Sequence, residues 1–200
     1  VYNIISTAYF SNSRNINSKH VFLQLEILDL SNNNLTHLGR LQFIQQERLQ
    51  HLNLSNNLIG RLNSKDTFKG PLSLQNLDLS KNILTSLQLK TFSGLRALIE
   101  LHLTSNKLSN IENGAFGGLN RLRVLHLENN LLTSLNSSWL QELSSLRFLY
   151  LSNNRLRELG EGTFKPLVGL SVLSLHDNRI HSIDEMAFEG SIGRSLDTLD

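Results

Sequence analysis

The chain has 200 residues, of which 40% are hydrophobic, and its 19 basic and 17 acidic residues nearly balance. The absence of cysteine excludes disulfides, thiol catalysis and cysteine-based zinc sites within these residues. No apolar run reaches the roughly 18 residues of a membrane-spanning helix, and no basic stripe indicates a phosphate-binding surface. Leucine, with 44 residues, and asparagine, with 23, are far more frequent than in an average globular protein, which indicates internal repetition.

A leucine pattern repeats along the chain. The string L-x-x-L-x-L-x-x-N-x-L, with Ile in some last positions, occurs seven times, and an eighth copy opens as LDTLD. The copies begin at Leu25, Leu49, Leu74, Leu98, Leu122, Leu146, Leu170 and Leu196, which are 24 to 26 residues apart. Repetition at this spacing predicts a solenoid in which each repeat forms one coil.

Each repeat carries the pattern of one short strand. Two leucines alternate with more polar residues, which is the period of a strand with one buried face. Because a single coil leaves its leucines exposed to water, neighbouring coils must stack their strands into a parallel sheet. The predicted fold is therefore an α/β leucine-rich solenoid, a curved horseshoe with a parallel sheet on its concave side, made of about seven full repeats and a truncated eighth.

Two further positions recur in the repeats. An asparagine stands where the chain leaves each strand, and its amide can satisfy turn backbone groups that would otherwise be buried without partners. This predicted asparagine ladder consists of Asn33, Asn57, Asn82, Asn106, Asn130, Asn154 and Asn178. A phenylalanine stands 18 or 19 residues after most repeat starts and predicts a second interior spine, made of Phe43, Phe68, Phe92, Phe116, Phe164 and Phe188. In the fifth repeat Leu140 takes this slot, and Trp139 is expected to fill the convex side rather than to anchor a ligand.

A repeat of this length with Phe in that slot, and without an L-x-G-x-I-P motif, resembles the extracellular "typical" leucine-rich repeat class of animal proteins. The stretch GAFGGLNRLRVLHLENNLLTSLNSSWLQELSSLRFLYLSNN is similar to the leucine-rich repeat and immunoglobulin-like family, and FEGSIGRSLDTLD is similar to chaoptin-type and Toll-type receptors. The resemblance covers residues 23–200 and implies an extracellular or cell-surface receptor or adhesion glycoprotein. Residues 1–22 match poorly and are expected to form a degenerate segment or partial repeat. Since the cysteine-containing caps of the family are missing, we expect an interior fragment of a larger receptor-like protein or an incomplete gene model.

The residues between the leucines are expected to face outward on the concave side. In the first three repeats they are mainly Asp, Asn and Ser, which predicts a solvated surface. In repeats four to seven they include histidines, aromatic residues and valines, and apolar patches with aromatic anchors tend to be binding sites. The predicted ligand-binding patch consists of Glu100, His102, Val124, His126, Glu128, Phe148, Tyr150, Val172 and His176. The alternative is that Phe148 and Val124 merely pack on neighbouring strands.

Histidines are concentrated among these outward positions. His102 and His126 should lie on adjacent strands with Glu128 nearby, and imidazole with carboxylate can bind zinc. Because no sequence motif of a ligand set is present, we predict neither a metal site nor a cofactor. A contact sensitive to pH is a better use of these residues, since imidazole changes its charge near pH 6–7.

Three N-x-S/T sequons predict glycosylation at Asn34, Asn53 and Asn136. Asn136 lies in an irregular segment and is the best acceptor of the three. Asn53 is expected on a concave strand, where a glycan would cover that part of the face.

The sequence contains no G-x-S-x-G, H-E-x-x-H, phosphate-binding glycine loop or EF-hand string, so we do not expect an enzyme. The favoured function is protein–protein recognition by the concave face. A Toll-like module for a non-protein ligand, such as a nucleic acid or a glycan, is the alternative and would require a basic face and steep salt dependence. Since the concave charges are mostly Asp, Glu and His, no nucleic-acid partner is expected, and no membrane contact within this segment. A third reading is a spacer with an inert face.

Overall fold

A computed structural model describes residues 24–39, 43–62, 67–190 and 195–200. The segment of residues 1–22, for which a degenerate repeat was expected, lies outside the described residues. In the described part of the chain no helix is both long and apolar enough to cross a bilayer.

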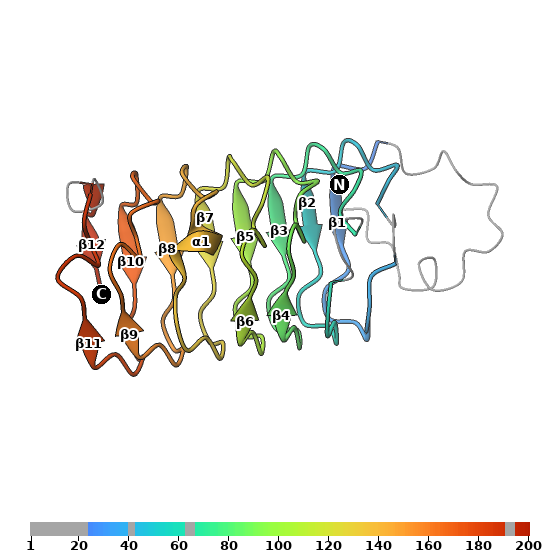
Figure 1. The fold of residues 1–200 in the computed structure, drawn as a ribbon. Coiled ribbons are helices and arrows are strands. Elements are labelled where there is room, and N and C mark those ends of the chain that lie inside the picture. The colour runs from blue at the N-terminus through green and yellow to red at the C-terminus, as the bar shows by residue number, and fades with distance from the viewer. Residues whose placement is uncertain (1–23, 40–42, 63–66, 191–194) are drawn as a thin grey trace.

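The dominant element is an eight-stranded sheet in which neighbouring strands are parallel (Figure 1). Its strands follow chain order: β1 (Ile27–Asp29), β2 (His51–Asn53), β3 (Asn76–Asp78), β5 (Glu100–His102), β7 (Val124–His126), β8 (Phe148–Tyr150), β10 (Val172–Ser174) and β12 (Thr198–Leu199). The central leucine of one strand pairs with that of the next, as Leu101 does with Leu125. Because each repeat adds one strand in the same register, the leucine period decides which face is buried. The predicted parallel-sheet solenoid is confirmed.

The connections between these strands consist mainly of turns. Short parallel pairs join β4 (Ser86–Leu87) to β6 (Asn110–Ile111) and β9 (Glu158–Leu159) to β11 (Ser182–Ile183). Figure 1 shows these short strands at the lower end of the coils, away from the large sheet. Helix α1 (Ser137–Leu140) has only four residues, so helix contributes little to the fold.

Leucines and aromatic rings fill the space inside the coils. The strand leucines Leu101, Leu125 and Leu149 are fully buried, and burial of each such side chain stabilises the fold by about 1.5–3 kcal/mol. Behind them a phenylalanine column stacks from coil to coil, with ring centroids 5.8–6.3 Å apart from Phe43 to Phe116. Trp139 is buried and extends this column, since its ring centroid lies 5.5 Å from that of Phe116 at a 53° tilt. Phe188, which stacks on Phe164, is only partly buried.

From Asn57 onward, each ladder asparagine joins its own coil to the preceding one. The Asn106 amide donates to the carbonyls of Leu103 and Leu79, both at 3.0 Å, while its Oδ1 accepts from the Leu84 amide at 3.0 Å. The same three contacts recur at Asn57, Asn82, Asn130, Asn154 and Asn178. The amide thus satisfies backbone groups that the turn leaves inside the coil.

The residue before each ladder asparagine adopts a left-handed conformation, with φ between 52° and 58°. Asparagine and aspartate tolerate this region better than other L-residues. They occupy most of these positions, and the exceptions are Lys81 and Ser105. This turn explains part of the asparagine excess in the composition.

Candidate ligand-binding site on the sheet face

We use the name sheet face for the solvent-facing side of the eight-stranded sheet. The residues on either side of each central leucine point to this face, because side chains alternate along a strand. The strand register aligns them in two rows. The first row includes Glu100, Val124, Phe148 and Val172, and the second includes His102, His126, Tyr150 and Ser174. Most of the predicted patch therefore lies on four adjacent strands.

Three rings of the second row stack on one another and form what we call the ring column. The centroids of His102 and His126 are 4.5 Å apart with the planes 6° from parallel. Those of His126 and Tyr150 are also 4.5 Å apart, at 10°. The parallel sheet causes this stacking, since it repeats the same side-chain position at nearly the spacing of its strands, about 4.7–4.9 Å.

A carboxylate holds each histidine of the ring column in place. Nε2 of His102 lies 2.8 Å from Oε1 of Glu100, and Nδ1 of His126 lies 2.8 Å from Oε1 of Glu128. The second carboxylate oxygens are also engaged: the Asn76 amide donates to Glu100 and the Thr104 hydroxyl donates to Glu128, both at 2.8 Å. These bonds fix the imidazole orientations.

Glu128 is ionised at neutral pH. Burial raises the pKa of Glu128, but hydrogen bonds from His126, from its own backbone amide and from Thr104, together with the attraction of His126, outweigh this effect. The pKa of Glu128 is therefore lower than its usual value. Since an ionised carboxylate only accepts hydrogen bonds, Nδ1 of His126 carries the proton between them.

Phe148 is the large apolar residue of the patch that reaches solvent, with 36% of its surface exposed. Its register partners Val124 and Val172 are half-buried and flank it on both sides. His176 lies one strand beyond Tyr150 and faces acidic groups instead of the rings. Its Nδ1 is 2.9 Å from Asp177, and its Nε2 is 3.8 Å from Asp200.

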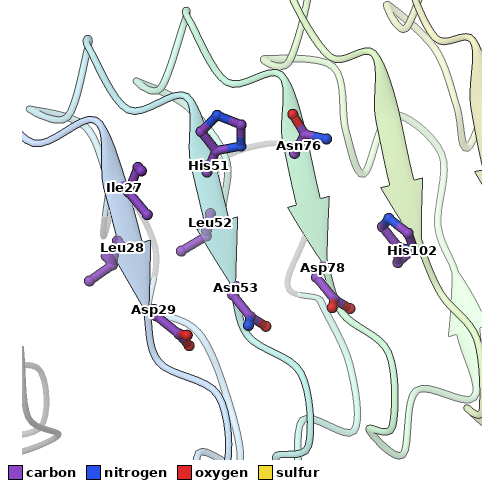
Figure 2. Close-up of a pocket in the computed structure, with 9 residues that line it drawn as sticks. All are labelled: Ile27, Leu28, Asp29, His51, Leu52, Asn53, Asn76, Asp78 and His102. Atoms are coloured by element: carbon purple, nitrogen blue, oxygen red, sulfur yellow. The ribbon is translucent and has the colours of Figure 1, made fainter. Parts of the chain in front are cut away.

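A shallow hollow of about 370 Å³ opens on the first strands of the sheet face (Figure 2). Its lining residues are Ile27, Leu28, Asp29, His51, Leu52, Asn53, Asn76, Asp78 and His102. The Asp, Asn and Ser residues of these repeats predicted a plain solvated surface. Ile27 and His51, which interrupt the run of Asp, Asn and Ser, are the sequence signal that would have located the hollow. Because His102 belongs both to the hollow and to the ring column, the two features adjoin.

Arginines gather at the edge where the chain enters the central strands, a feature that sequence analysis missed. Arg123 directly precedes Val124, and Arg147 directly precedes Phe148; both are exposed. The Arg147 guanidinium donates to the carbonyl of Gly169 at 2.7 Å. Arg121 is exposed in the same segment. These arginines lie just before the strand residues that alternate between the two faces. They are missed when only the outward-facing strand positions are considered as candidate site residues.

The three sequon asparagines differ in their surroundings. Asn136 is exposed and caps helix α1, because its Oδ1 accepts from the Ser138 amide at 2.8 Å. Asn34 is also exposed. Asn53 is partly buried on β2 and lines the hollow of Figure 2.

A family model described as leucine rich repeat matches residues 23–66, 64–108, 96–156 and 149–200. The chain belongs to the leucine-rich repeat family. Among curated proteins no sequence matches this leucine-rich repeat chain.

Two solved structures contain longer chains that are similar to this leucine-rich repeat chain. The TLR13–ssRNA13 complex is similar to it with a TM-score of 0.82 and 30% sequence identity, over 88% of this chain and 24% of the matched one. The octameric complex of Latrophilin 3 (Lec, Olf), Unc5D (Ig, Ig2, TSP1) and FLRT2 (LRR) contains a chain with a TM-score of 0.76 and 31% identity. That match covers 88% of this chain and 52% of the other. The chain thus spans about a quarter and about half of these two proteins.

Proposed function

We propose that this leucine-rich repeat chain recognises another protein through its sheet face, as part of an extracellular receptor or adhesion protein. The observation that carries the proposal is the exposed Phe148 beside the ring column. Protein interfaces are typically organised in this way, with an aromatic anchor surrounded by polar groups. No catalytic step is part of the proposal.

The sheet face is ordered before a partner arrives. The ring column is stacked, and the carboxylates beside it already have hydrogen-bond partners. A partner that binds here has few side chains to immobilise, which lowers the entropic cost of association. One of the similar solved structures is itself a complex of several proteins, which supports a protein partner for this chain.

The test compares a double variant in the patch with a control variant at another exposed position of the sheet face. Phe148→Ala/Tyr150→Ala removes the anchor and the end of the ring column, whereas Ile27→Ala truncates another exposed apolar residue in the outward position of β1. Purified full chains are screened against a panel of cell-surface ectodomains by surface plasmon resonance. We expect a partner of the wild type to bind the double variant about 10-fold or more weakly, as the loss of a hot spot implies. Equal binding by all three chains would contradict the proposal.

A nucleic-acid or glycan ligand is a second candidate, because exposed arginines lie along the entrance to β7 and β8. The similar TLR13 structure is a complex with single-stranded RNA. For this candidate, binding of single-stranded RNA should fall steeply between about 50 and 200 mM salt. It should also weaken in Arg121→Ala/Arg123→Ala but not in Arg157→Ala/Arg179→Ala, which removes two exposed arginines elsewhere. RNA binding that neither salt nor these variants change would exclude this candidate.

Extracellular placement also makes Asn136 the preferred glycan acceptor. Its exposed side chain caps α1 through Oδ1, which leaves the nitrogen that carries a glycan outside that bond. Expression in a secretory cell line should give a band that an N-glycosidase shifts, and Asn136→Gln should remove most of that shift. An unchanged shift in the variant would place the glycan elsewhere.

A further inference from the structure

Three metal-ligating side chains converge at the start of the ring column. A carboxylate oxygen of Glu100 and one ring nitrogen from each of His102 and His126 lie within 4.8 Å of one another. They come from the adjacent strands β5 and β7, so their backbones are fixed by the sheet ladder. Two imidazoles and one carboxylate form a ligand set that zinc uses in proteins, with a fourth position left for water or another ligand.

His126 has the supporting hydrogen bond that is common in metal-binding histidines. Its Nδ1 binds Glu128 at 2.8 Å, which leaves the lone pair on Nε2 free of that bond. Histidines that bind metals commonly donate their other ring N–H to a carboxylate in this way. Glu128 is held in turn by the Thr104 hydroxyl, which donates to its other carboxylate oxygen at 2.8 Å. The site thus has the supporting hydrogen bonds that position a ligand.

Glu100 and His102 are positioned for the same ion. The Asn76 amide holds one oxygen of Glu100, and the other oxygen lies 2.8 Å from Nε2 of His102. A metal ion can replace the proton between this nitrogen and oxygen, whereupon the His102 imidazole carries its proton on Nδ1. Because imidazole is neutral in both tautomers, the exchange requires no further proton acceptor.

We propose that Glu100, His102 and His126 form a binding site for Zn²⁺ on the sheet face. Zinc bonds of about 2.0–2.1 Å place neighbouring tetrahedral ligands roughly 3.3–3.5 Å apart, closer than the widest separation here. Side-chain rotations that shorten these separations therefore close the site, and they splay the two stacked imidazoles. Glu128 is a positioning residue in this arrangement and not a ligand. From the sequence, Glu128 was the expected neighbour of the two histidines, and no metal site was predicted.

The site shares His102 and His126 with the ring column of the proposed recognition surface, but it includes neither Phe148 nor the arginine edge. Because Zn²⁺ binding is measured without a partner, zinc binding and partner binding can be tested separately. His102 also lines the hollow of Figure 2, which places the open side of the site next to that surface.

The first test measures Zn²⁺ binding to the full, metal-free chain by isothermal titration calorimetry at neutral pH. We expect one saturable site in the wild type and no binding at the same concentrations in His102→Ala or His126→Ala. His51→Ala is the matched control, since it removes an exposed histidine of β2 and should bind like the wild type. Glu128→Gln should weaken binding by about 10-fold or more, as the loss of such an orienting partner does.

A second measurement identifies the ligand geometry and guards against a variant that fails to fold. Co²⁺ added to the wild type should give the intense visible absorption of tetrahedral coordination, and Zn²⁺ should displace it. Glu100→Gln, which preserves side-chain volume, should lower this absorption while circular dichroism stays unchanged. The proposal is overturned if the wild type shows no saturable Zn²⁺ binding. It is equally overturned if the folded histidine variants bind Zn²⁺ as tightly as His51→Ala.

Discussion

The interior of the coils and the sheet face lie one residue apart along every strand, yet they follow different rules. Inside, repeats two to six present the same leucines and the same ladder asparagine, buried to nearly the same extent. Outside, the aligned positions change from Asp29, Asn53 and Asp78 on the first strands to His102, His126 and Tyr150 further along.

This difference shows how a repeat protein separates its stability from its specificity. The interior must match from coil to coil, because every repeat packs against its neighbours and nothing else. The sheet face has no such requirement, so its residues can vary without loss of the fold. The ring column is where that variation has produced three matching planar groups in succession.

The largest expected effect is on the free energy of unfolding. It comes from a comparison of two adjacent residues, one in the interior and one on the sheet face. Leu125→Ala should lower the free energy of unfolding by about 2–5 kcal/mol, because it leaves a cavity in a fully buried position. Val124→Ala, on the half-buried sheet face, should lower it by no more than about 1 kcal/mol. Urea unfolding followed by circular dichroism measures both. Similar losses in the two variants would mean that the sheet face is part of the core.

A smaller loss is expected from the asparagine ladder. In Asn106→Leu, the carbonyls of Leu79 and Leu103 keep the neighbouring ladder donors Asn82 and Asn130. The Leu84 amide loses its acceptor inside the coil, which should cost about 1–3 kcal/mol. Asn120→Leu, at an exposed position, is the control and should change the urea midpoint little. An unchanged midpoint in Asn106→Leu would contradict the structural role of the ladder.

The smallest effect is a stabilisation. Ser105 adopts φ 58° in the turn where most other repeats have Asn or Asp. Ser105→Asn should therefore raise the free energy of unfolding by about 0.5 kcal/mol, since asparagine tolerates the left-handed region better. Ser134→Asn, which is exposed and does not have a positive φ, should leave stability unchanged. Equal shifts of the melting temperature in both variants would rule out the left-handed backbone conformation as the cause of the stabilisation.

The fold could be predicted from the sequence because the same residue types recur at a fixed spacing. Leu25, Leu49 and their successors fix the repeat length, and the alternation around each strand leucine fixes the sheet. The turn conformation of Lys81 and Ser105 could not be predicted from those two residues alone. It follows from the Asn and Asp that hold the same place in the neighbouring repeats.

The sequence predicted which strands carry the candidate site, but it did not predict the contacts between the side chains of the site. The alternation correctly aligned His102, His126 and Tyr150, since backbone register alone determines that order. Which carboxylate each imidazole would meet depends on side-chain rotation, and here Glu100 pairs with His102 while Glu128 pairs with His126. The binding roles of the patch residues remain predictions. The hollow beside them depends on side-chain sizes in several coils at once, which no single repeat reveals.

Trp139 is the only tryptophan of the chain, and it lies buried in the middle repeats against Phe116. Its fluorescence therefore reports on the centre of the array, whereas circular dichroism averages over all coils. If the outer coils fray before the centre opens, the emission maximum will shift later in a denaturant titration than the dichroism signal does. The indole of Trp139, in the repeat that lacks the spine phenylalanine, thus gives the chain a built-in optical probe of how cooperatively its coils come apart.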